Sequence, residues 1–364
     1  MSETVNLNDL VQSRIDIFLA SRDSILAQVG DDLAPFSLFS REFLSGGKRF
    51  RASFCYWGWS SVSGASSWSD DALAAVVSVA GSLEIFHAAA LVHDDLIDNS
   101  DTRRGAPAAH RRFESLHGAA GWEGNGDHYG RSAAILFGDL LLGWSDELLD
   151  EGLAGLDPAA ARATRSEFIR MRTEVTAGQY LDILEERAWR TRAEDEQLAR
   201  AQQVLTFKSA KYSVESPLVI GALLGGGTAD QVAALRAFGL PLGVAFQLRD
   251  DLLGVFGDTA VTGKPSGDDL LEGKRTVLVA LTRAALLPTA RRIFDELLGD
   301  PTLSPDQIAS LQATIRESGA VEQVESMIAD NVAEATRALD GAPLAVDAVE
   351  RLLALADAVT RRTY

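Results

Sequence analysis

The pattern of apolar and polar positions along the chain is helical almost throughout. Apolar residues recur at intervals of three and four, the period of one helix face, and the alternation typical of strands is nearly absent. We therefore expect an all-α fold of roughly a dozen helices. Segments 118–130 and 257–273 predict loops. The predicted helices span residues 7–29, 50–63, 70–97, 130–151, 158–190, 194–224, 229–256, 276–286, 289–298, 305–318, 320–339 and 344–361.

The chain shows no internal boundary. No shift in composition divides it and no solenoid repeat is present, so we predict a single domain over residues 1–364. The most apolar stretch, residues 72–92, is interrupted by Glu84 and His87, which favours a buried core helix over a membrane span. Helices that are apolar on several sides must be buried, some of them against a second copy of the chain. This predicts a homodimer.

Composition narrows the range of partners. Of the 364 residues 46% are hydrophobic, and the net charge is −18 with a pI near 4.7. Such an acidic protein is a poor partner for nucleic acid or an anionic membrane, so any anion it binds needs a local positive field. The single cysteine, Cys55, excludes an internal disulfide and argues against a cysteine-based zinc site. The N-terminus lacks the pattern of a signal peptide, so we expect a cytoplasmic protein.

Two aspartate clusters lie within apolar helical runs. The first (AAALVHDDLID) contains Asp94, Asp95 and Asp98, and the second (FQLRDDLLGVFGD) contains Asp250, Asp251 and Asp258. Residues four apart share a helix face, so Asp94 and Asp98 repel one another unless a cation lies between them. Mg²⁺ takes carboxylate oxygens and completes its shell with substrate phosphate and water. The clusters predict a site for Mg²⁺ and a diphosphate, and a solvated acidic face is the alternative.

Lysine is rare and clustered. Five lysines occur among the 34 basic residues, in the segments GGKRFR, FKSAK, TGKPS and EGKRT. A compact ammonium suits phosphate oxygens, so we predict that at least four of the five contact phosphate. Chance clustering in loops is the alternative. The five are Lys48, Lys208, Lys211, Lys264 and Lys274.

The segment GGKRFR, residues 46–51, precedes a predicted helix. Its glycines let the backbone approach an anion, and the helix N-terminus offers N–H donors. Lys48 and Arg51 lie about one turn apart and share a face. The spacing is not that of a P-loop, because Arg49 stands where a hydroxyl residue is required. A helix cap with surface basic residues is the alternative.

Arg103 and Arg104 follow the first acidic cluster. Adjacent side chains at a helix end point in different directions, so this pair can serve two anions; a solvated turn is the alternative.

His87 lies two turns before Asp94 on nearly the same face, so it either faces the site or is a core histidine. No other histidine has a metal-ligand spacing. The charges predict a metal-bridged phosphate site with Arg103, Lys208 and Lys264, and a purely basic one with Lys48, Arg51 and Arg104.

These motifs resemble, in order and spacing, those of the trans-isoprenyl diphosphate synthases, the polyprenyl synthetase family. The resemblance rests on GGKRFR, VHDDLIDNSDTRRG, GQYLDI, FKSAK, FQLRDDLLGVFGD and GKRT, and it covers about residues 40–280. Overall the chain is similar to the actinobacterial geranylgeranyl diphosphate synthases. The resemblance implies an all-α isoprenoid synthase fold with a central cavity, and an enzyme that is Mg²⁺-dependent.

The resemblance also implies roles for individual residues. It implies that Asp94 and Asp98 hold two Mg²⁺ ions and Asp250 a third, with support from Asp95 and Asp251. The allylic diphosphate is expected to bind Arg103, Lys208 and Lys264, with Lys274 at the rim. Isopentenyl diphosphate is expected to bind Lys48, Arg51, His87 and Arg104. Ser209, with Lys208 and Gln247, is expected beside the carbocation, Gln179 and Asp182 in support, and Lys211 has no assigned role.

The chain departs from the family pattern at three positions. Gly254 stands where many members have Asp, Ser209 replaces Thr but keeps the hydroxyl, and Ala52 follows GGKRFR where Pro is common. Because Asp250 is retained, we expect activity to persist. Below the first cluster, the small Ala89 and Ala90 leave room for a growing chain, and Phe86 is expected to form the pocket floor.

The implied reaction is 1′–4 chain elongation of an allylic diphosphate by isopentenyl diphosphate, giving mainly the C20 product, geranylgeranyl diphosphate. A farnesyl or longer polyprenyl diphosphate synthase is the alternative. A terpene cyclase has no need of the second, basic phosphate site. A non-catalytic partner subunit typically lacks one acidic cluster, and this chain keeps both.

Overall fold

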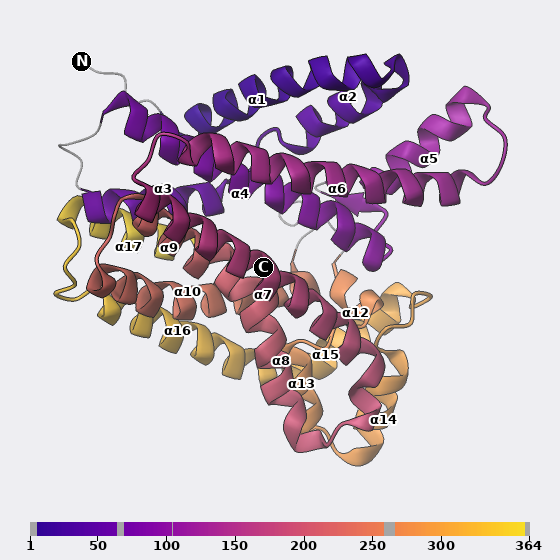
Figure 1. The fold of residues 1–364 in the computed structure, drawn as a ribbon. Coiled ribbons are helices and arrows are strands. Elements are labelled where there is room, and N and C mark those ends of the chain that lie inside the picture. Colours follow the sequence, from indigo (N-terminus) through magenta and orange to yellow (C-terminus); the bar gives the residue numbers. More distant parts are fainter. Residues whose placement is uncertain (1–5, 64–68, 104, 258–265, 361–364) are drawn as a thin grey trace. The chain divides into compact units, whose positions relative to one another are not determined.

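The structure, a computed structural model, describes residues 6–63, 69–103, 105–257 and 266–360 (Figure 1). In those residues the all-α prediction is confirmed, because the only strands are β1 (Thr102–Arg103) and β2 (Ala106–Pro107), a two-residue antiparallel pair. The chain forms two compact units. Unit 1 comprises residues 1–165 and 220–227, and unit 2 comprises residues 166–219 and 228–364. That they form one domain around a central cavity stays a prediction.

Unit 1 is built around one long apolar helix. Its elements are α1 (Leu7–Val29), the short 3-10 helix Asp31–Leu33, α2 (Ala34–Phe43), α3 (Phe50–Ser63), α4 (Asp70–Ile97), β1, β2, α5 (Ala109–Ala120) and α6 (Gly126–Leu153). The central helix is α4, which packs against α1, α3 and α6. Gly152 permits close contact between α4 and α6, because a Cβ there would lie 3.1 Å from the Ala75 carbonyl oxygen.

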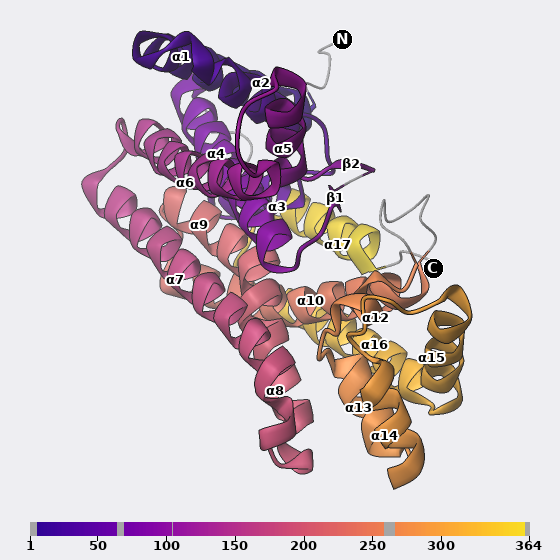
Figure 2. The same ribbon diagram turned by 90° about the vertical axis from the view of Figure 1, so that its right-hand side faces the viewer.

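Unit 2 contains most of the remaining helices (Figure 2). Two helices, α7 (Pro158–Ala188) and α9 (Ser216–Leu224), cross between the units. The others are the 3-10 turns Trp189–Thr191 and Glu194–Glu196, α8 (Gln197–Val204), a π-helix η5 (Leu205–Glu215), α10 (Ala229–Phe256), α12 (Asp268–Glu272), α13 (Val277–Ala285), α14 (Pro288–Leu297), α15 (Pro305–Glu317), α16 (Ala320–Ala338) and α17 (Val346–Thr360). The core of this unit gathers around α10, which packs against η5 and α16.

Two long apolar helices, α4 and α10, resemble membrane spans in composition but differ in burial. By length and composition alone, α4 and α10 are able to cross a membrane. In α4, however, 78% of the most apolar window is buried in the protein, in agreement with the prediction of a core helix for residues 72–92. Their ends follow the sequence closely, since Ser69 caps α4 and Thr228 with Gln231 forms a capping box on α10.

Several elements differ from the sequence prediction. The single helix predicted over residues 194–224 is instead a 3-10 turn, α8, η5 and α9 in succession. The helices α2, α5 and α12 were not predicted, and α12 lies within the expected loop 257–273. The β1–β2 pair replaces the helix end expected at Arg103.

Candidate active site

The first acidic cluster ends helix α4. Asp98 caps this helix, and its backbone N–H donates to the Asp94 carbonyl oxygen over 2.8 Å. Asp95 is completely buried and accepts a hydrogen bond from Arg103 Nε over 2.9 Å. Arg103 Nη2 also lies 3.6 Å from Asp94 Oδ2. Arg103 therefore contacts the first acidic cluster, and the roles predicted for Arg103 and Asp95 stay predictions.

The segment that follows the cluster is fixed by polar contacts. Asn99 has a positive φ of 55° and accepts a hydrogen bond from Arg131 Nη2 over 2.6 Å. The Asp101 carboxylate accepts from Arg111 Nε over 2.7 Å, which ties the β1–β2 pair to α5. These contacts set where Arg103 lies. Arg104 lies outside the described residues.

The GGKRFR segment makes a left-handed turn before α3. Gly46, Gly47 and Arg49 have φ values of 66°, 85° and 48°. Arg49 is buried and donates from Nη2 to the Gln12 side-chain carbonyl and, over 2.8 Å, to the Leu44 carbonyl oxygen. Arg49 is thus a structural residue, which the sequence reasoning missed.

The predicted anion-binding residues flank this turn. Lys48 is exposed and Arg51 is half-buried. The free helix N–H groups expected here are partly occupied, because the Ala52 amide donates to Glu84 Oε1 over 3.0 Å. His87, three residues beyond Glu84 on α4, is half-buried.

Three further residues of α4 were predicted to limit product length. Phe86 and Ala89 are buried, and Ala90 is partly buried. All three precede Asp94 by one to two turns of the same helix, so their spacing along α4 is as expected.

The second acidic cluster lies on α10. Asp250 is exposed, whereas Asp251 is buried and accepts a hydrogen bond from Gln247 Nε2 over 2.8 Å. The Ser209 hydroxyl donates to Gln247 Oε1. Burial, helped by the neighbouring carboxylates of Asp269 and Asp250 and opposed by the Gln247 hydrogen bond, raises the pKa of Asp251 to about 8. A cation at this cluster would offset the repulsion.

The π-helix η5 carries the FKSAK lysines. Lys208 donates to Asp182 on α7, and Lys211 Nζ lies 2.9 and 3.0 Å from the Glu174 carboxylate oxygens. Lys211, which had no predicted role, therefore has an ion-pair partner inside unit 2. Gln179, predicted as a supporting residue, is half-buried on the same helix as Asp182.

Two glycines let neighbouring helices approach the π-helix. A Cβ at Gly178 of α7 would lie 2.4 Å from the Lys208 backbone nitrogen, and one at Gly243 of α10 would lie 2.3 Å from the Ala210 carbonyl oxygen. Both contacts are with backbone, so neither position has room for a side chain. The backbone around Lys208 and Ser209 is therefore held from two sides.

A carboxylate occupies the space beside Gly254. A Cβ built at this position would lie 2.0 Å from Asp269 Oδ2. The other oxygen of Asp269 lies 3.5 Å from Lys274 Nζ. The same Lys274 nitrogen lies 2.6 Å from Glu272 Oε2. Asp269 therefore brings a negative charge to the place where many family members carry the aspartate that this chain lacks. Asp258 and Lys264 lie outside the described residues.

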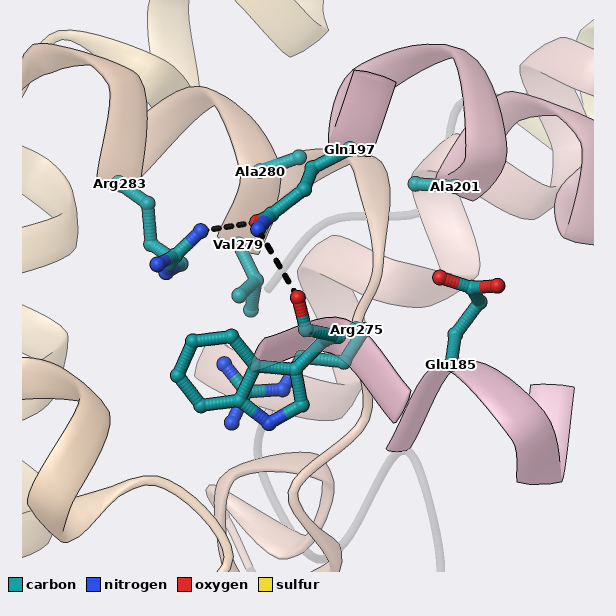
Figure 3. A pocket seen from close by; sticks show the side chains of 8 residues that line it. Glu185, Gln197, Ala201, Arg275, Val279, Ala280 and Arg283 are labelled. Carbon is teal, nitrogen blue, oxygen red and sulfur yellow. Dashed lines mark hydrogen bonds between the residues drawn. The ribbon is translucent and has the colours of Figure 1, made fainter. Parts of the chain in front are cut away.

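A small pocket lies beside the GKRT segment (Figure 3). The guanidinium carbon of Arg275 lies 3.7 Å from the Trp189 ring centroid, and that of Arg283 lies 4.7 Å from it. Asp295 pairs with both arginines, at 3.4 Å from Arg275 Nη1 and 2.6 Å from Arg283 Nε. Burial lowers the pKa of Arg275 to about 10. The pocket is lined by Glu185, Trp189, Gln197, Ala201, Arg275, Val279, Ala280 and Arg283.

Each acidic cluster, taken by itself, has a donor set that fits magnesium. Its members are carboxylates, the ligands that Mg²⁺ prefers. Among the described residues no group of three or more His, Cys, Asp or Glu side chains could hold a metal ion by itself.

A sequence model of the polyprenyl synthetase family matches residues 36–315. The chain belongs to this family. It is 31% identical to geranylfarnesyl diphosphate synthase of Aeropyrum pernix over 78% of this chain and 81% of that protein. It is also 31% identical to geranylgeranyl diphosphate synthase of Methanosarcina mazei, over 80% of this chain and 81% of that protein.

Solved structures of the polyprenyl synthetase family agree with this. A crystal structure of geranylgeranyl pyrophosphate synthase from Corynebacterium glutamicum, complexed with isoprenyl diphosphate and magnesium, is 38% identical, with a TM-score of 0.92 over 100% of both chains. The predictions of the family and of the isoprenoid synthase fold are thereby confirmed, as is an enzyme of the isoprenyl diphosphate synthase class.

Proposed function

We propose that this enzyme condenses isopentenyl diphosphate with allylic diphosphates and releases mainly geranylgeranyl diphosphate. The observation that carries the proposal is that one sequence contains two acidic helix clusters and separate lysine and arginine motifs. In this proposal the separate basic motifs serve one diphosphate each. The likeness to the Corynebacterium glutamicum enzyme supports the C20 product. The Aeropyrum pernix relative keeps a longer product open as an outcome of the test.

Basic residues neutralise the allylic diphosphate as it leaves. In this proposal Arg103, Lys208, Lys264 and Lys274 bind that group, so that negative charge is stabilised as it develops. Mg²⁺, when bound, adds positive charge to the same leaving group. Asp94 and Asp98 would hold two ions and Asp250 a third, with Asp95 and Asp251 in support.

The remaining residues position the second substrate and the cation. Lys48, Arg51, His87 and Arg104 bind isopentenyl diphosphate. The Ser209 hydroxyl donates to the Gln247 side-chain carbonyl, and in this proposal Ser209 and Gln247 lie beside the allylic cation. The isopentenyl double bond attacks this cation, forming the new carbon–carbon bond, and the released pyrophosphate takes the proton. No side-chain nucleophile is needed.

Product analysis tests this proposal. The purified chain is incubated with Mg²⁺, labelled isopentenyl diphosphate and, separately, each allylic primer, and the dephosphorylated alcohols are analysed by mass spectrometry. We expect mainly a C20 alcohol. A hydrocarbon formed without label would indicate a terpene cyclase, and no product from the chain alone would indicate a non-catalytic subunit.

The metal role is tested by removing one carboxylate. Asp94→Ala should lower kcat by about 100-fold or more, because stabilisation of the leaving diphosphate is lost, and excess Mg²⁺ should not restore it. Asp330→Ala, which changes an exposed aspartate on α16, is the matched control. Full activity of Asp94→Ala would contradict the assignment.

We also propose that the enzyme is a cytoplasmic homodimer. Ile135 and Leu136 on α6 are 50% and 62% exposed, a pair of apolar side chains suited to a second copy. Leu136→Glu should shift the sedimentation coefficient to that of a monomer. A wild-type protein that sediments as a monomer at micromolar concentration would contradict the dimer.

A further inference from the structure

Two lysine motifs of this chain share an unexpected feature. In GGKRFR and in GKRT an arginine directly follows the lysine, as Lys48-Arg49 and Lys274-Arg275. In both pairs the arginine is the more buried partner, with Arg49 5% exposed and the Arg275 side chain 11% exposed. Buried guanidinium groups are costly unless they are paired or hydrogen-bonded. Their contacts therefore indicate what each arginine does.

Arg49 fixes the turn before α3. Its backbone has the unfavourable φ of 48°, and its Nη2 donates to Gln12 on α1 and to the Leu44 carbonyl oxygen beyond α2. One nitrogen thus satisfies two acceptors from different elements. The contacts hold the backbone between Lys48 and the first turn of α3, so they also fix the backbone position from which the Lys48 side chain extends.

Arg275 fixes the segment before α13. Its guanidinium stacks on Trp189 at 3.7 Å, within the range of a strong cation–π contact, and pairs with Asp295. Figure 3 shows Arg275 among the pocket residues with Gln197 and Arg283, which are joined by a hydrogen bond. The neighbouring Lys274 points the other way, toward Glu272 and Asp269.

We infer that Arg49 and Arg275 are positioning residues, each the buried anchor of the lysine before it. The anchored lysine presents its ammonium to a diphosphate, so the ligand class is an anion of the pyrophosphate type. The inference rests on the proposed function for the roles of Lys48 and Lys274. Arginine suits the anchor role because its planar fork can bond and stack in fixed directions, which lysine cannot do.

Amine labelling tests the inference without catalysis. The full chain is acetylated with and without inorganic pyrophosphate and Mg²⁺, and each lysine is followed by mass spectrometry. At ten times its Kd, pyrophosphate should slow acetylation of Lys48 and Lys274 about tenfold. Arg49→Lys should lose the protection at Lys48 only, and Arg275→Lys at Lys274 only, so each variant serves as the control for the other.

Two further controls are built into the chain. Lys211, paired with Glu174, should label equally in all variants. Arg292, whose side chain is 74% exposed, can be changed to lysine without removing a buried contact. Thermal unfolding of each variant identifies one that fails to fold, and Trp189→Phe then replaces Arg275→Lys as the test at Lys274.

Kinetics adds a second readout. Each arginine variant should raise KM for one substrate about tenfold, because about one charged hydrogen bond to that substrate is lost. The substrate should be the same one whose KM rises when the neighbouring lysine is changed to alanine. The inference would be overturned if both arginine variants kept their protection against acetylation within twofold of the wild type. It would also be overturned if one variant lost protection at both lysines, or if pyrophosphate protected neither lysine in the wild type. A wild type that shows protection but no chain elongation would contradict the proposed function alone.

Discussion

At the scale of single residues, polar groups in the interior of unit 1 direct the segments that carry the charged motifs. His110 is an example, since it is buried at the start of α5 beside Asp101, which anchors the β1–β2 pair. Burial lowers its pKa, helped by the positive charges of Arg111 and Arg131 and opposed by Asp101 and Asp127. His110 is therefore neutral in the folded protein near pH 7.

This depressed pKa predicts a pH dependence of stability. Below about pH 6.5 the unfolded chain binds a proton at His110 that the folded chain resists, so stability is lost as the pH falls from 7 toward 5. Urea unfolding of the wild type and of His110→Gln, at pH 7.5, 6.0 and 5.0, measures the difference. The wild type should lose more free energy of unfolding on acidification, and parallel losses in both proteins would contradict the assignment.

At the scale of elements, the π-helix η5 is shaped by its neighbours. Gly178 and Gly243 bring the backbones of α7 and α10 against it, and the ion pairs of Lys208 and Lys211 with α7 fix its rotation. The sequence alone predicts one α-helix over residues 194–224. The π-helix depends on contacts with distant glycines that local periodicity does not contain.

A methyl group at Gly178 tests this view. Gly→Ala in a helix ordinarily stabilises by roughly 0.5–1 kcal/mol, but here the new Cβ would lie 2.4 Å from the Lys208 nitrogen. Gly178→Ala should therefore destabilise by about 1–3 kcal/mol and lower kcat. Gly118→Ala on α5, where nothing lies within 4 Å, should show the ordinary gain. Equal effects in urea unfolding would contradict the close approach.

Helix α4 is one of four helices, with α1, α3 and α10, whose bounds were predicted to the residue. Its bounds, Asp70–Ile97, match the sequence prediction, because an N-cap serine precedes a long apolar run and the acidic cluster ends it. Short elements such as α12, and contacts such as Asp269 beside Gly254, were not predictable, because they depend on how distant segments pack. The sequence pointed to the carboxylates and also to Arg103 and Gln247, but not to the hydrogen bonds that Arg103 donates to Asp95 and Gln247 to Asp251.

Helix α4 also carries the predicted length control. Ala90→Phe, about one turn before Asp94, should shorten the main product toward C15. Phe86→Ala, about two turns before Asp94, should lengthen the product beyond C20. The reason is that one helical turn, about 5.4 Å, approximates the length of one isoprene unit. Chromatography of the dephosphorylated alcohols measures both. Unchanged products from both variants would show that this part of α4 does not limit the chain.

At the scale of the whole molecule, the net charge is strongly negative while the lysines are concentrated in a few motifs. The net charge is −18, yet the five lysines are confined to four short motifs. Because the net charge is so negative, the positive field that a diphosphate needs must be local, and added salt should weaken substrate binding less than it would for a uniformly basic protein.

The single thiol offers a probe of opening in unit 1. Cys55 on α3 is fully buried, its pKa is raised by burial, and a Cβ at Gly221 would lie 1.9 Å from its carbonyl oxygen. Modification by a thiol reagent should be at least about 1,000-fold slower in the folded protein than in urea, because α3 must first open. Rapid labelling of the folded protein would contradict this packing.

The position of Asp269 has a consequence for engineering. A carboxylate at residue 254 would be fixed by the register of α10, whereas Asp269 reaches the same space from the five-residue helix α12. The negative charge beside Asp250 and Asp251 therefore depends on how firmly α12 packs against its neighbours. Substitutions that loosen α12 should therefore tune the affinity for divalent cations in graded steps and leave the aspartates of α10 in place.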